Sequence, residues 1–326
     1  MMRFLFSIAL IPAGLIIGLI LKSYLSKKNA PDELNEKIRK SLQVISILVL
    51  NPIAFTGAVW VIPLDDLEVI FLPFLGIAAI ALGGFISILY TGIRKMDRPF
   101  RGSHFCASYY TNIGSIGGLI VFALLGEPGF ALMPFYKLME PAMYFGLGFP
   151  IASRFGDKKD KGKGLLQILK DPFVTISMGS ILLGFIFNMS GLERPGFYAG
   201  LNSILIPLGS ALLLISIGMA MHMEKMKKYA GSTYSVLLIK FVLVPFIITG
   251  AAWLLGLGRI QEGIPLMTVF ILSSMPAGFV AIMPPSLYKL DLHFANAAWL
   301  STMLALVIVV PWLYFSLNYL LPFLIQ

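Results

Sequence analysis

The chain has 326 residues, of which 58% are hydrophobic and only 13% are charged. Soluble globular domains carry about 25% charged residues, so this composition excludes an ordinary soluble protein. The net charge of +9 comes from lysines and arginines between apolar runs, which indicates membrane topology rather than nucleic-acid binding. A single cysteine, Cys106, excludes an intrachain disulfide framework and a cysteine-based metal cluster, and no other pattern predicts a metal or cofactor.

Apolar segments long enough to cross a bilayer, which takes about 20 residues, follow one another along the chain. We therefore predict an all-α, multi-pass membrane protein with ten transmembrane helices. The predicted spans are 4–24, 40–62, 69–92, 103–125, 129–153, 172–190, 199–222, 233–256, 264–288 and 295–320.

The loops between these spans differ sharply in positive charge. Twenty lysines and arginines fall in the first, third, fifth, seventh and ninth loops or in the span ends beside them, whereas the other loops hold only Arg194 and Arg259. Because cytoplasmic loops carry the excess of positive charge, we expect these odd-numbered loops in the cytoplasm and both termini outside. A plasma (inner) membrane location follows as an expectation.

The chain also carries a weak internal repeat with a constant shift of 164 residues. Under this shift, for example, Glu127 aligns with Asp291 and Phe130 with Phe294. Chance similarity between apolar segments is the alternative explanation. A true repeat would comprise 1–163 and 164–326, with five spans each, and an odd number of spans inverts one copy relative to the other. Inverted repeats are typical of secondary transporters.

Two predicted spans contain poor helix formers at matched positions. They are "YYTNIGSIGG" (109–118) in the fourth span and "SSMPAGFVA" (273–281) in the ninth. An interrupted helix exposes amide groups that suit an anion and carbonyl groups that suit a cation. Close approach of two helices at the glycines is the alternative. We predict a substrate site here, with Asn112 as its leading member, formed by Thr111, Asn112, Gly114, Ser115, Ser273, Ser274, Pro276, Ala277 and Gly278.

Charged residues inside the predicted spans provide candidates for ion coupling. Lys137 and Glu140 lie three residues apart in the fifth span, and they can simply neutralise each other. Alternatively the pair faces the interrupted helices, and protonation of Glu140 frees Lys137 to attract an anion. Lys240 is a weaker candidate, because it lies near a span end and can extend to the membrane surface.

At this point the chain resembles the auxin efflux carrier family, which includes malate and malonate permease-like proteins of the bile/arsenite/riboflavin transporter superfamily. The resemblance covers most of the chain and rests on a set of degenerate motifs. They are "LNPIAFTG" (50–57), "NIGSIGG" (112–118), "IPLGSALLLISIGMAM" (206–221), "SSMPAGFVAIM" (273–283) and "WLSTMLALVIVVPW" (299–312).

This resemblance implies ten helices in two inverted repeats, with crossed broken helices 4 and 9. It also implies a permease that moves a small organic anion by secondary transport. The chain departs from the family after the Met-Pro of the ninth span, where a polar residue is usual and Ala277, Gly278 and Phe279 stand here. A sodium-coupled bile-acid-type organic anion symporter is the alternative.

We therefore expect a carrier in the lipid bilayer, coupled to protons or sodium, rather than an enzyme. An ATP-driven pump would need a phosphate-binding G-x-x-x-x-G-K-[ST] loop, which the sequence lacks. The acidic "DDLE" (65–68) is an isolated turn and a weak sign of a metal-dependent enzyme. An exposed helical face could pair two copies into a homodimer.

Overall fold

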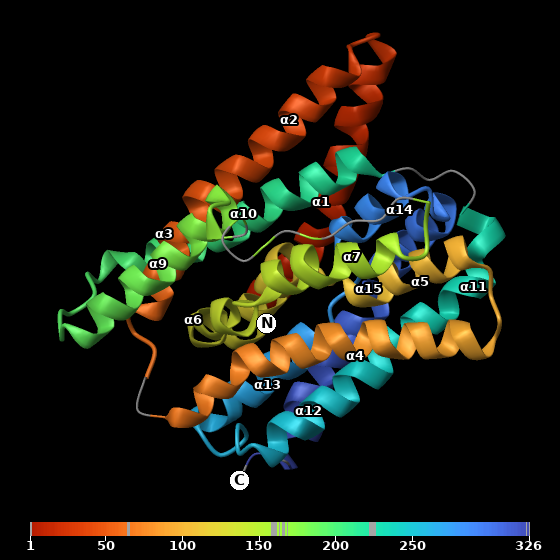
Figure 1. Cartoon of the computed structure of the whole chain (residues 1–326). Helices are drawn as coiled ribbons and strands as arrows, with labels where there is room; N and C mark the ends of the chain where they lie inside the picture. The colour runs from red at the N-terminus through yellow and green to blue at the C-terminus, as the bar shows by residue number, and fades with distance from the viewer. Residues whose placement is uncertain are drawn as a thin grey trace. The chain divides into compact units, whose positions relative to one another are not determined.

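The computed structural model describes residues 2–63, 66–157, 162, 164, 167, 169–221, 226–323 and 325. The regular elements of this part of the chain are all helical (Figure 1). Among these residues, β-type pairing is limited to one isolated bridge between Thr111 and Ala277. The predicted all-α class is therefore confirmed for the described residues.

Eight helices among the described residues are long and apolar enough to cross a membrane. The chain is thus a multi-pass membrane protein. These candidate spans are Ala9–Lys27, Asp32–Val59, Glu68–Ile93, Ile113–Tyr136, Pro172–Met189, Phe197–Ala220, Gly231–Leu254 and Leu292–Phe323. The predicted spans 129–153 and 264–288 do not appear as continuous long helices, since prolines, serines and glycines divide them.

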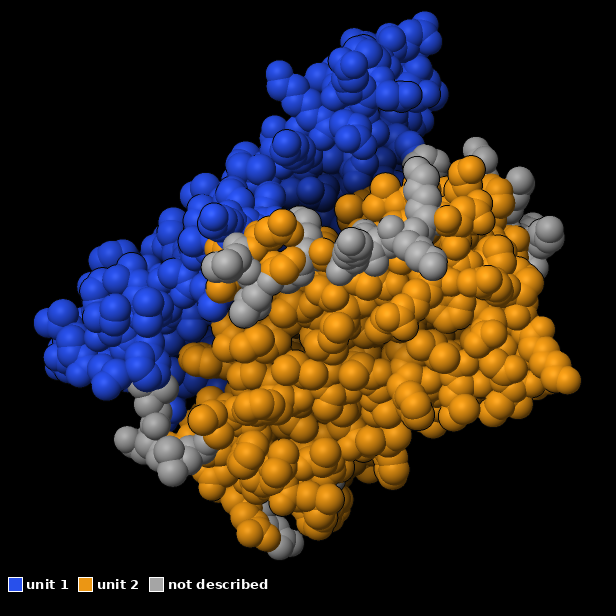
Figure 2. All heavy atoms as spheres, viewed as in Figure 1, with its two compact units in different colours: residues 1–65, 114–134, 170–221 blue, residues 66–113, 135–169, 222–326 orange. Residues whose placement is uncertain are grey.

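The chain forms two compact units, coloured blue and orange in Figure 2. The first contains Met1–Asp65, Gly114–Pro134 and Lys170–Met221. The second contains Asp66–Ile113, Phe135–Leu169 and His222–Gln326. Each unit combines segments that are far apart in the sequence, so its packing depends on contacts of long range.

In the first unit, α10 (Phe197–Ala220) packs against three α-helices and the π-helical turn Ser46–Leu50. The three α-helices are α1 (Met2–Lys27), α2 (Asp32–Ile45) and α3 (Asn51–Val59), and α3 also packs against α9 (Pro172–Met189). The π-helical turn joins α2 to α3 without a break in helical backbone. The helices α1, α3 and α9 are strongly apolar, whereas the first turns of α2 carry charge.

Glycines bring α1 and α10 into close contact. A Cβ atom at Gly18 would lie 2.8 Å from the Cα of Gly218 and 2.7 Å from the amide nitrogen of Met219. A Cβ atom at Gly218 would likewise lie 3.0 Å from the Cα of Gly18. The two backbones therefore touch, which is how small residues permit tight helix packing in membranes, where lipid provides little hydrophobic driving force.

A half-buried ion pair joins the segment after Gly126 to the rest of the first unit. The ribbon of α6 (Gly118–Tyr136) contains two helices, because Gly126 has φ 68° and ψ −156°. Directly after this bend, Glu127 accepts hydrogen bonds from both terminal nitrogens of Arg194, and its Oε1 accepts another from Asn202 Nδ2 at 2.6 Å. Arg194 also donates to the carbonyl of Gly57 at 2.8 Å.

The second unit is built around α4 (Leu72–Ile93), α5 (Arg98–Tyr109) and α15 (Leu292–Phe315). α4 packs against α5, α12 (Val244–Leu254) and α13 (Ile264–Ser273). α15 packs against α5 and α11 (Met226–Leu238). Short helices complete it, namely Leu67–Phe71, Ala142–Gly148, α7 (Phe149–Ser153), Gln261–Gly263, Phe279–Ile282, α14 (Met283–Leu287), Ser316–Leu320 and Leu321–Phe323.

Several helices widen into a π-helical turn just before a proline. The turn Ser46–Leu50 precedes Pro52, and the turn Ile239–Leu243 precedes Pro245. Proline lacks an amide proton, and its ring clashes with the carbonyl four residues earlier. A wider turn relieves this conflict and changes the direction of the side chains within it. Lys240 lies in the second of these turns.

We predict that Gly18→Leu destabilises the protein, because the new side chain would force α1 and α10 apart. Overpacking of this kind costs about 1–3 kcal/mol. The measurement is thermal unfolding of detergent-solubilised protein. Gly179→Leu is the matched control, since Gly179 lies in α9 and a Cβ atom there would have no neighbouring atom within 4 Å. Equal stability of the two variants would contradict the close packing of α1 and α10.

Candidate functional site

The second unit contains two helices that stop short of crossing a bilayer. α5 ends at Tyr109 after 12 residues and α13 ends at Ser273 after 10 residues. At 1.5 Å per residue they are only about 15–18 Å long, roughly half of a bilayer's hydrocarbon core. Extended backbone follows in both cases, at 110–112 and 276–278. Both interruptions lie within the two stretches that the sequence predicted.

The two extended segments, 110–112 and 276–278, pair with each other in antiparallel orientation. We call this pair of segments the crossing. An amide without a partner is costly in an apolar environment, and here the two interruptions satisfy one another. The bridge lies between Thr111 and Ala277, and it is flanked by Asn112 N donating to Pro276 O at 2.8 Å and Gly278 N donating to Tyr110 O at 3.1 Å.

Gly278 permits this close approach. A Cβ atom there would lie only 2.9 Å from the carbonyl oxygen of Thr111, so a larger residue would push the two segments apart. Pro276 has no amide proton and cannot continue the hydrogen bonding of α13. Its carbonyl instead accepts from Asn112. The composition that makes this stretch a poor helix is therefore what allows the crossing.

Two hydroxyl groups complete the hydrogen bonding of the crossing. The Tyr144 hydroxyl accepts from the amide of Thr111 at 2.8 Å and donates to the carbonyl of the same residue at 3.0 Å. Thr302 Oγ1, in α15, accepts from the amide of Ala277 at 3.1 Å. Both side chains are buried, so each bond is shielded from water.

Lys240 places a cationic side chain directly on the crossing. Its Nζ donates to the carbonyl oxygen of Tyr110 at 3.0 Å and to Thr111 Oγ1 at 2.6 Å. The residue is only 2% exposed, so its side chain does not extend to a surface. The sequence-based expectation that Lys240 reaches the membrane interface is therefore wrong. The π-helical turn Ile239–Leu243 is the element that carries it.

Lys137 and Glu140 are paired and lie beside this cluster. Lys137 Nζ is 3.7 Å from Glu140 Oε2, across a turn that follows α6. Glu140 also interacts with the Tyr144 hydroxyl and, electrostatically, with Lys240. The Tyr144 hydroxyl thus connects the acidic residue to the backbone of Thr111. The pairing of Lys137 with Glu140 is therefore present in the structure, and Glu140 reaches the interrupted helices only indirectly, through Tyr144.

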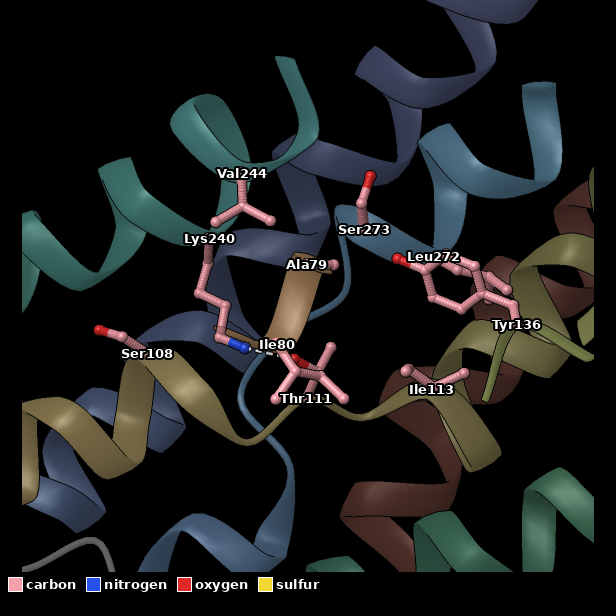
Figure 3. A pocket seen from close by; sticks show the side chains of 10 residues that line it. All are labelled: Ala79, Ile80, Ser108, Thr111, Ile113, Tyr136, Lys240, Val244, Leu272 and Ser273. Atoms are coloured by element: carbon pink, nitrogen blue, oxygen red, sulfur yellow. Dashed lines mark hydrogen bonds between the residues drawn. The ribbon is translucent and has the colours of Figure 1, made fainter. Parts of the chain in front are cut away.

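A small cavity adjoins Lys240 and Thr111 (Figure 3). Its free space is close to that of one water molecule or small ion. Two buried hydroxyls in its wall, those of Ser108 and Tyr136, have no hydrogen-bond partner among the described residues. The lining residues are Ala79, Ile80, Ser108, Thr111, Ile113, Tyr136, Lys240, Val244, Leu272 and Ser273.

The structure distributes the predicted substrate-binding residues unevenly. Five of them form the crossing, namely Thr111, Asn112, Pro276, Ala277 and Gly278. Ser273 and Ser274 are buried next to it, but both hydroxyls donate to the carbonyl of Phe270 in their own helix. Gly114 and Ser115 belong to the first unit, in the π-helical turn Ile113–Gly117 that follows the interruption.

Three residues of this cluster were missed or undervalued in the sequence. Lys240 is the only charged residue between 231 and 254, and that isolation was the signal available. Tyr144 and Thr302 carried no signal, because many tyrosines and threonines occur in apolar segments of this chain. Their roles depend on which backbone groups they meet, and those groups belong to distant segments.

Comparison with known proteins gives one informative relative. No family model matches the chain. The chain is 25% identical over 253 residues to a protein of Methanocaldococcus jannaschii that is named as an uncharacterized transporter. The match covers 75% of this chain and 76% of the relative. Together with the apolar helices, this similarity supports a membrane transporter.

We predict that Tyr144→Phe destabilises the protein by about 1–3 kcal/mol, because it leaves the buried amide and carbonyl of Thr111 without their partner. Unfolding of the purified protein, followed by amide hydrogen exchange of the segment 109–113, measures the effect. Tyr234→Phe is the control, since Tyr234 is 68% exposed. Unchanged exchange in the segment would show that Tyr144 does not hold the crossing.

Proposed function

We propose that this protein is a secondary active transporter that moves a small organic anion, a carboxylate, across the membrane by alternating access. The observation that carries the proposal is the crossing of two interrupted helices with a buried lysine on it. Irregular backbone at such a place in a membrane protein is tolerated where it lines a cavity or is covered by protein, and transporters use it for binding.

The charges around the crossing favour an anion. Lys240 and Lys137 supply two cationic groups, whereas Glu140 supplies one acidic group that already pairs with Lys137. Charges in a medium of low dielectric constant act strongly on a ligand. A carboxylate would therefore be attracted to this part of the second unit, and amide groups of the interrupted helices would add to that attraction.

We assign the binding of the anion to the polar residues of the two interruptions. Asn112 remains the leading candidate, because its amide can donate to a carboxylate and its backbone already belongs to the crossing. Thr111, Ser273 and Ser274 would contribute hydroxyls. The hydrogen bonds that Ser273 and Ser274 now donate to the Phe270 carbonyl would be exchanged for bonds to the ligand. The free space beside Thr111 is too small for an organic anion, so binding requires a more open conformation.

We further propose ten spans in two inverted repeats, 1–163 and 164–326, and membership in the auxin efflux carrier family. Matched features support the repeat. Glu127 begins a helix after the bend at Gly126, and the aligned Asp291 caps the start of α15, accepting from Phe294 N at 2.9 Å. In this proposal α5 and the first half of α6 form the fourth span, and the second half of α6 continues through Ala142–Gly148 and α7 as the fifth. The interrupted helix that begins with α13 is the ninth span, and the other seven candidate spans complete the ten.

Ion coupling is assigned to the Lys137–Glu140 pair. Glu140 contacts the crossing through Tyr144, so a change in its charge would reach the backbone of Thr111. Neutralising Glu140 would release Lys137 to interact with the anion. The position of the pair, beside the binding residues rather than at a span end, supports this role.

Asn112→Ala should lose binding of the carboxylate that the parent protein binds, while it still inserts and purifies normally. The measurement is a thermal-shift screen of mono- and dicarboxylates on the parent, followed by titration of the variant with the best ligand. Asn318→Ala is the control, since the Asn318 side chain donates to the Tyr314 carbonyl in its own helix. Unchanged affinity in Asn112→Ala would remove this residue from the site, and transport without any ligand of this class would overturn the substrate assignment.

The topology gives a separate prediction. Tags after residue 63 and after residue 192 should be accessible from outside, because these positions lie in loops poor in positive charge. Tags at both termini should also be accessible from outside, because the first and the ninth loops are expected in the cytoplasm. Tags after residues 30 and 95 should be accessible only from inside. Impermeant labelling of intact cells measures both sets. Termini on opposite sides of the membrane would rule out ten spans and the inverted repeat.

A further inference from the structure

The oxygen atoms that accept hydrogen bonds from Lys240 are of the kind that coordinate a small hard cation. The ammonium is bound by a main-chain carbonyl, that of Tyr110, and by the hydroxyl oxygen of Thr111. Sodium ions in transporters are bound by unwound backbone carbonyls and the carbonyl ends of half-helices. Oxygen is the ligand atom that hard cations prefer. At this crossing, the Lys240 ammonium already occupies the position beside such oxygens.

The location at the end of α5 strengthens this comparison. The last carbonyls of a helix have no amide partner within it and carry the negative end of its dipole. Tyr110 is the residue that directly follows α5, and its carbonyl accepts from both Gly278 N and Lys240 Nζ. The negative charge that the interruption exposes is therefore countered by the lysine.

The lysine is also fixed in place. It is 2% exposed, and the π-helical turn before Pro245 directs it at the crossing from an adjacent helix. A bound sodium ion can exchange with the solution, but a buried side chain with two hydrogen bonds stays with its helix. Glu140, the acidic group nearest to it, has Lys137 as a second partner. One acidic group therefore faces two lysines in this cluster.

We infer that the Lys240 ammonium takes the place of a coupling sodium ion, so that the organic anion transport proposed above does not require sodium. A sodium ion 4 Å from the ammonium would bind on the order of a thousandfold more weakly than without it, from Coulomb repulsion at an effective dielectric constant of about 20. Removing the lysine leaves the oxygens of Tyr110 and Thr111 together with the adjoining cavity, whose free space suits one small ion.

The test uses sodium itself as the ligand and no organic substrate, so its outcome is independent of the transported anion. Thermal unfolding of the purified full chain is measured in sodium chloride, potassium chloride and choline chloride at equal ionic strength. The parent should unfold at the same temperature in all three. A sodium-specific rise in the unfolding temperature of the parent would overturn the inference.

The same measurement on Lys240→Ala should reveal sodium-specific stabilisation that grows with sodium concentration, because a ligand of the native state stabilises it by mass action. Lys240→Gln gives a second uncharged variant that retains more packing. Lys95→Ala is the control and should remain insensitive to sodium, since Lys95 is an exposed lysine between α4 and α5. If both Lys240 variants fail to fold in any salt, or fold without gaining a sodium response, then the oxygens do not form a cation site and the inference is overturned.

Discussion

The structure depends on the mutual hydrogen bonding of two interrupted helices in the second unit. Outside a helix, every backbone amide and carbonyl in an apolar environment must find another partner. The segments around Thr111 and Ala277 solve this by pairing with each other, and Gly278 makes the pairing sterically possible. The Tyr144 hydroxyl bonds the amide and carbonyl of Thr111, and the Thr302 hydroxyl accepts from the amide of Ala277. Without these contacts, neither interruption could persist among apolar helices.

This arrangement explains how the second unit accommodates charged residues beside the crossing. Lys240 binds the carbonyl oxygen of Tyr110, which the interruption exposes, and Glu140 lies close to both lysines of the cluster. Charges of opposite sign, together with polar backbone, make the burial of each group tolerable. The same cluster contains the lysines that the proposed anionic substrate would use. Stability of the crossing and the proposed function therefore share the same residues.

The first unit uses a different means of holding its helices together. α1 and α10 approach until their backbones touch at Gly18 and Gly218, and the Glu127–Arg194 pair joins three segments through a bidentate contact. Van der Waals contact and a hydrogen-bonded ion pair both remain effective in lipid, where burial of apolar surface provides little gain. The polar groups of this pair thus serve to cross-link the helices of the unit.

The sequence by itself determined the class of protein and the position of the interruptions. Apolar runs of about 20 residues match the thickness of a bilayer and therefore indicate membrane spans. The serines, prolines and glycines of 109–118 and 273–281 disfavour a helix through their own local preferences, so these interruptions can be recognised without knowledge of the segments that they contact. The pairing of Lys137 with Glu140 is also a local matter of spacing. The tertiary structure alone decided that Lys240 lies on the crossing and that Tyr144 and Thr302 complete its hydrogen bonds. These contacts join residues 25 to 130 positions apart, and a single sequence carries no physical signal for which distant backbone group a buried side chain will meet.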